Sequence, residues 1–89
     1  MDVAITEFLI ASNGIVAQAY CGKDSACIST HVSVYGQEVR VIYQNASHQA
    51  FRKSGKAFTS FEEAIEAYKK PEIRAMLQAV AKKIKEGDS

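Results

Sequence analysis

The 89-residue sequence has no apolar run long enough to cross a membrane and no surplus of charge of one sign. A membrane-spanning helix needs roughly 20 consecutive apolar residues, and the formal net charge is only +1. A secretory signal begins with a cationic segment, whereas Asp2 and Glu7 here precede the first cation, Lys23. We therefore expect a cytoplasmic protein without a membrane partner. Whole-chain charge gives no indication of nucleic-acid binding.

Motifs for metal binding and catalysis are also missing. Five residues separate the two cysteines, Cys21 and Cys27, whereas zinc knuckles place their ligands two to four residues apart. The loop that begins at Gly22 lacks the spacing of a phosphate-binding loop. We expect no metal, no cofactor and no catalytic residue, and two reduced cysteines, as is usual in the cytoplasm. A Cys21–Cys27 disulfide remains an alternative, and a thiol or metal enzyme using Cys21, Cys27 and His31 remains a third functional hypothesis.

The composition is that of a globular protein. Apolar residues make up 47% of the chain and charged residues 24%, both ordinary values for a folded domain. A chain of 89 residues has room for one hydrophobic core, so we expect a single domain over residues 1–89. Its core is small, and burial in a dimer is therefore a reasonable expectation.

A β-hairpin is the clearest local pattern, with strands over residues 28–35 and 38–44. A two-residue loop, Gly36-Gln37, is typical of a type II′ turn. Its register predicts three pairs that share one face, with alternate residues on the other face. These pairs are Val34 opposite Val39, Val32 opposite Val41, and Thr30 opposite Tyr43.

Two helices are predicted in the C-terminal third, over residues 60–69 and 71–85. Phe61 and the apolar residues three, four and seven positions later form a helical stripe. Thr59 or Ser60 is expected to cap the first helix. Pro71 lacks a backbone N–H and is expected in the first turn of the second helix.

The first 21 residues fit two interpretations. The apolar spacing favours one long helix, and the alternative is a helix over residues 2–12 followed by a strand over residues 15–20. Residues 48–53 are compatible with a third strand. The expected fold is therefore α+β, a small antiparallel sheet packed on one face by an N-terminal helix and two C-terminal helices.

Two macromolecular partners are considered. The leading hypothesis is a small non-enzymatic interaction or regulatory protein that binds another macromolecule, as a homodimer or with a different protein. Its interface would use part of the apolar stripe of the last helix: Ile73, Met76, Leu77, Val80 and Ile84.

The alternative is a nucleic-acid-binding protein with a basic sheet face over residues 40–56. This segment contains four cations and no acid, with His48 counted as neutral. The residues expected to bind are Arg40, His48, Arg52, Lys53 and Lys56.

Overall fold

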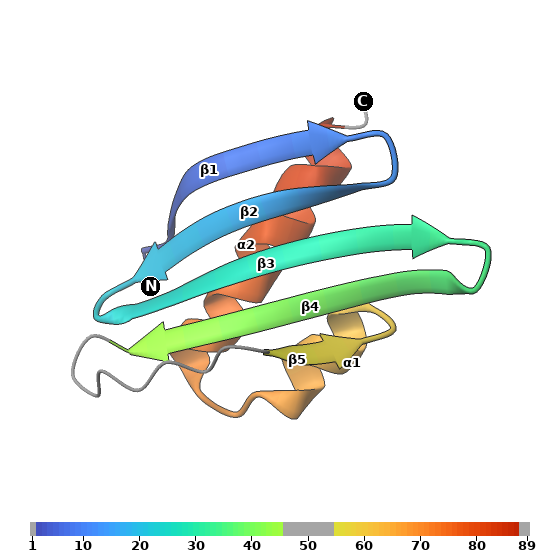
Figure 1. The fold of residues 1–89 in the computed structure, drawn as a ribbon. Helices are drawn as coiled ribbons and strands as arrows, with labels where there is room; N and C mark the ends of the chain where they lie inside the picture. Colours follow the sequence, from blue (N-terminus) through green and yellow to red (C-terminus); the bar gives the residue numbers. More distant parts are fainter. Residues whose placement is uncertain (1, 46–54, 88–89) are drawn as a thin grey trace.

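The computed structural model describes residues 2–45 and 55–87 (Figure 1). Five antiparallel strands follow one another in the sheet in the order β1-β2-β3-β4-β5, and two helices come after them. The elements are β1 (Ala4–Ala11), β2 (Gly14–Cys21), β3 (Asp24–Ser33), β4 (Gly36–Asn45), β5 (Lys56–Phe58), α1 (Phe61–Ala67) and α2 (Pro71–Gly87). The α+β class is confirmed, with both helices after the strands.

Both helices cover the same face of the sheet (Figure 1). Helix α2 packs on β2 and β3, and α1 packs beside β4 and β5. The other face of the sheet has no helix over it among the described residues. The buried apolar residues between the two layers are Ala17, Ala19, Cys21, Ala26, Ile28, Val39, Val41, Ala64, Ile73, Met76, Leu77 and Val80.

Small side chains beneath α2 match the large ones that the helix supplies. Ala17, Ala19 and Ala26 are fully or almost fully buried on β2 and β3. Met76 and Leu77 of α2 are also completely buried. Because close packing requires the two layers to interdigitate, short residues on the strands leave room for long residues on the helix.

The predicted N-terminal helix is wrong, because residues 4–11 and 14–21 are the strands β1 and β2. The register of β1 shifts between Ile5 and Glu7, as a β-bulge does. The bulge leaves both Ile5 and Phe8 packed against the core, so that β1 shows a three-residue spacing that imitates a helix. The second half of the alternative interpretation, a strand over residues 15–20, agrees with β2.

The close approach of β2 and β3 explains Gly14. A Cβ atom at this position would lie 1.8 Å from the carbonyl oxygen of Thr30. The Ile15 N–H donates a hydrogen bond of 3.1 Å to the Thr30 side-chain oxygen next to this contact. Glycine is therefore required where the chain leaves the β1–β2 turn, and the turn signal of Asn13-Gly14 marks a hairpin.

The predicted central hairpin is present, but its register differs. The turn is Val34-Tyr35, with Ser33 opposite Gly36. The observed register pairs Ile28 with Val41, two fully buried residues. It differs from the prediction by an even number of residues, so the predicted inward face of Val39 and Val41 is retained.

Both C-terminal helices are confirmed, with α1 shorter than predicted. The Ser60 hydroxyl caps α1 by accepting a hydrogen bond from the Glu63 N–H at 3.1 Å. The Glu63 carboxylate in turn accepts hydrogen bonds from the Thr59 N–H and hydroxyl. Pro71 is the first residue of α2, as expected. The predicted strand over residues 48–53 lies outside the described residues.

Candidate functional site

The uncovered face of the sheet carries a group of exposed apolar side chains. We call this the open face, meaning the side chains of β1 to β4 that point away from α1 and α2. Leu9 of β1 is paired with Val16 of β2, and their exposed fractions are 63% and 42%. Tyr20 lies further along β2 and is 45% exposed. Large apolar side chains on an uncovered face are typical of an interaction surface.

The middle of the open face is occupied by small residues of β3. Ser29 lies between Val16 and Arg40, and Cys27 lies between Gln18 and Ile42. Burial raises the pKa of the Cys27 thiol above its ordinary value of 9.0, and the Glu7 carboxylate raises it further. The thiol is therefore protonated at neutral pH, which disfavours a nucleophilic role.

The two cysteines lie on opposite faces of the sheet. Cys21 alternates with the buried Ala19 and points toward the helices, whereas Cys27 is on the open face and both are free thiols. His31 follows Cys27 on the same strand face, roughly 13 Å further along at the usual rise. These three residues do not converge, and the described residues contain no cluster of His, Cys, Asp or Glu with metal-ligand geometry.

The residues predicted to bind nucleic acid are not brought together where the structure describes them. Arg40 lies on the open face, where it forms a 2.8 Å ion pair with Glu38. Lys56 of β5 is paired with the inward-facing Val41, and its ammonium group lies 6.0 Å from the centre of the Tyr68 ring on the helix side. Arg40 and Lys56 therefore point to opposite faces.

The remaining residues of that prediction, His48, Arg52 and Lys53, lie outside the described residues. On the described part of the open face, Glu7 and Glu38 outnumber Arg40. This balance does not supply the cationic surface that phosphate contacts require.

The predicted protein interface on α2 is largely the core. Ile73, Met76, Leu77 and Val80 are buried, and Ile84 is partly buried against them. The sheet of the chain itself covers this stripe, since five strands provide more apolar area than the two or three expected from the sequence. A partner therefore cannot reach the four buried side chains in the folded chain, which corrects the expectation that they form the interface.

The residues that replace them escaped prediction because of the misassigned N-terminus. A helical interpretation places Leu9, Val16 and Tyr20 with the core residues of one helix face. Interpreted as strands, they alternate with Phe8, Ala17 and Ala19, and this alternation is the signal that separates an inward face from an outward one.

A charge cluster around the buried Asp24 lies at the end of the sheet where β3 begins. The Asp24 carboxylate is 3% exposed, accepts a hydrogen bond of 2.5 Å from the Tyr43 hydroxyl, and forms a 3.0 Å ion pair with Lys70. The hydrogen bond to Asp24, followed by the one to Tyr43, raises the pKa of Lys70. Because Lys70 connects α1 to α2, the cluster attaches this connection to the sheet and has a structural role.

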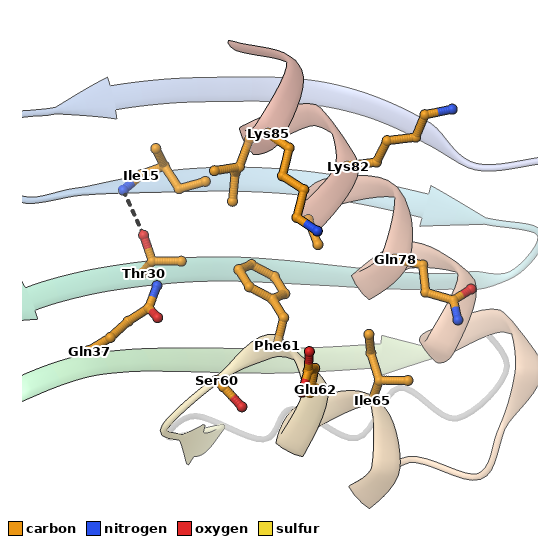
Figure 2. A pocket seen from close by; sticks show the side chains of 12 residues that line it. Ile15, Thr30, Gln37, Ser60, Phe61, Glu62, Ile65, Gln78, Lys82 and Lys85 are labelled. Atoms are coloured by element: carbon orange, nitrogen blue, oxygen red, sulfur yellow. Dashed lines mark hydrogen bonds between the residues drawn. The ribbon is translucent and has the colours of Figure 1, made fainter. Parts of the chain in front are cut away.

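A cavity of about 530 Å³ lies on the helix side, between α1, the C-terminal half of α2 and strands β2 to β4 (Figure 2). Its apolar lining consists of Ile15, Phe61, Ile65, Ala81 and Ile84. Because the sheet lies between them, the cavity and the open face are separate surfaces.

Comparisons with known proteins do not extend this description. No family model matches the chain, and neither the curated proteins nor the solved structures contain a significant match. No helix within residues 2–45 and 55–87 is long and apolar enough to cross a membrane.

Proposed function

We propose that the chain is a non-enzymatic interaction protein that acts as a homodimer, with the open faces of two copies packed against each other. The observation that carries this proposal is the uncovered apolar group formed by Leu9, Val16 and Tyr20. The first macromolecular partner is then a second copy of the chain. Regulation of, or binding to, a further macromolecule would be a property of the dimer.

The size of the open face supports this proposal. Four strands spaced about 4.8 Å apart, each contributing about eight residues at 3.3 Å per residue, cover roughly 19 by 26 Å. Two such faces bury about 1,000 Å² together, which is close to the minimum area of a specific protein interface. An interface of this size, with polar groups beside the apolar ones, is expected to give a reversible dimer.

The chemistry of the open face also favours a protein partner over a nucleic acid. The side chains at its centre, Ser29 and Cys27 of β3, are small and weakly polar, so a second sheet can approach it closely. Its charges are mixed, since Arg40 is paired with Glu38. When two sheets pack face to face, their backbones lie about 10 Å apart and the side chains of the two facing surfaces interdigitate.

Analytical ultracentrifugation over a wide range of protein concentration tests the proposal. Val16→Glu places a charge in the proposed interface and is expected to shift the chain to the monomer. Val34→Glu is the matched control, because Val34 is 93% exposed in the β3–β4 turn. Circular dichroism establishes that both variants are folded.

A monomeric wild-type chain at every concentration would refute the proposal. Equal loss of the dimer in both variants would show that the contact lies elsewhere on the molecule.

A further inference from the structure

The cavity on the helix side has an apolar interior and an unequal set of charges at its edge. Phe61, Ile15 and Ile84 line it while remaining partly buried against the core. Two lysines, Lys82 and Lys85, line it together with one acid, Glu62, so its edge carries a net positive charge. Its volume of about 530 Å³ lies within the range of sites that hold small organic ligands.

The two lysines are placed differently. Figure 2 shows the Lys85 side chain pointing toward the Phe61 ring, whereas Lys82 extends away from that ring. Lys82 also lies 3.9 Å from Glu86 in an ion pair along α2. Lys85 is therefore the better placed of the two to meet an anionic group of a ligand that lies on Phe61.

We propose that this cavity binds a small monocarboxylate with an apolar body. The body packs on Phe61, Ile15 and Ile84, and the carboxylate pairs with Lys85. Apolar surfaces supply the burial, and one charged group fixes the orientation, as in other small-molecule sites. This site does not depend on the proposed dimer, because it lies on the opposite side of the sheet.

A second role of Lys85 must be separated from ligand binding. A cation in the last turn of α2 also stabilises the negative end of the helix dipole. Stability alone therefore does not test the proposal. Lys83 provides the control, because it lies on the same helix but outside the cavity lining, with its ammonium group 5.2 Å from the centre of the Phe8 ring.

The test is an NMR titration of the full chain with octanoate, octan-1-ol and octylammonium, three ligands of matched apolar length. Octanoate is expected to shift the amide signals of Ile15, Phe61 and Ile84. Octan-1-ol is expected to bind roughly 1.4- to fivefold more weakly, since an exposed ion pair contributes about 0.2–1 kcal/mol. Octylammonium, which meets Lys85 with a like charge, should bind more weakly still.

Lysine variants test whether Lys85 supplies the charge that pairs with the carboxylate. Lys85→Glu is expected to weaken octanoate binding by about fivefold or more, because attraction becomes repulsion. Lys83→Glu makes the same change in net charge and should leave the affinity within about twofold of wild type. If Lys85→Glu does not fold, Lys85→Gln serves instead, with an expected loss of about 1.4- to fivefold.

Three results would overturn the proposal: no octanoate binding, shifts centred away from the cavity, or equal affinity for octanoate and octan-1-ol. Equal weakening by Lys83→Glu and Lys85→Glu would also overturn it, since binding would then follow total charge. None of these results bears on the proposed dimer, which is measured without ligand.

Discussion

Replacing Tyr43 with phenylalanine removes one hydroxyl from the charge cluster around the buried Asp24 and leaves the ring in place. In the folded chain that hydroxyl donates a 2.5 Å hydrogen bond to Asp24, whose carboxylate is 3% exposed. Tyr43→Phe therefore leaves a buried carboxylate with one donor fewer. Water cannot easily replace the donor at a group so thoroughly buried, and the cost falls on the folded state.

The expected cost follows from the charge of the acceptor. A hydrogen bond to a charged group contributes about 1.5–3 kcal/mol to stability. For a domain of this size, 1 kcal/mol shifts the melting temperature by roughly 4–8 °C, so Tyr43→Phe should lower it by about 6–24 °C. The measurement is thermal and urea unfolding, with protein concentration held fixed because a dimer makes stability depend on concentration.

Tyr35→Phe is the matched control, since Tyr35 is 97% exposed and its change should stay within about 0.5 kcal/mol. A double-mutant cycle with Asp24→Asn adds a second test. If the charge of Asp24 is the reason for the cost, then Tyr43→Phe should cost only about 0.5–1.5 kcal/mol in the Asp24→Asn background. Equal effects of Tyr43→Phe and Tyr35→Phe would refute the reasoning.

Four further predictions follow from the same structure. Gly14→Ala should destabilise the fold by several kcal/mol, because its Cβ would lie 1.8 Å from the Thr30 carbonyl oxygen and β2 would have to separate from β3; urea unfolding measures this, and a change under about 0.5 kcal/mol would contradict it. The pKa of Lys70 is raised above its ordinary 10.5, so the stability that the ion pair contributes is complete below pH 10.5 and is lost as pH rises through the higher folded pKa. The stability difference between wild type and Lys70→Met should therefore shrink above that pH, and a constant difference would argue against the ion pair. Cys27 should react slowly with iodoacetamide until the pH exceeds 9.0, because burial and Glu7 raise its pKa, and Glu7→Gln should accelerate the reaction modestly; a rate equal to that of a free thiol at pH 8 would contradict this. Finally, fluorescence anisotropy with labelled DNA and RNA at about 50 and 200 mM salt tests the nucleic-acid alternative, and tight, salt-sensitive binding would support it despite the mixed charge of the open face.

The helices were predictable because their signals are local. The Ser60 hydroxyl caps α1 by accepting a hydrogen bond from the Glu63 N–H. Pro71 begins α2 because a residue at this position needs no N–H donor, and both signals involve only neighbouring residues. The inward face of the central hairpin was also predictable, because alternate residues of a strand lie on alternate faces. Both features require no knowledge of what lies far away in the chain.

The register of the hairpin and the N-terminal strands depend on distant contacts. Turn preference favours Gly36-Gln37, but burying Ile28 opposite Val41 moves the turn to Val34-Tyr35, since tertiary packing outweighs the preference of a single turn. The bulge after Ile5 hides the alternation of β1. The Asp24 cluster joins three segments that are far apart in sequence, so no local sequence pattern predicts it.

The wrong prediction of an N-terminal helix also explains why the proposed protein interface lies on the open face and not on α2. With two or three strands, the sheet is too small to cover the stripe of α2, and part of that stripe would be left for a partner. Five strands cover Met76, Leu77 and Val80 completely, and the additional strands bring their own outward side chains. The exposed apolar surface therefore includes Leu9 and Val16 on the opposite side of the sheet, which we propose as the dimer contact.

The two proposed sites are thus separated by the full thickness of the sheet, and this makes their tests independent. The cavity is lined by Ile15 and Phe61, whereas the proposed dimer would contact Val16. Ile15 and Val16 are neighbours on β2 whose side chains point to opposite faces, and β3 and β4 also contribute to both sites. The sheet is therefore the element through which the sites could affect each other. Octanoate should accordingly leave the dimer dissociation constant unchanged if the sheet is rigid, and a linked change, reciprocal in both directions, would show that the two sites are coupled through the sheet.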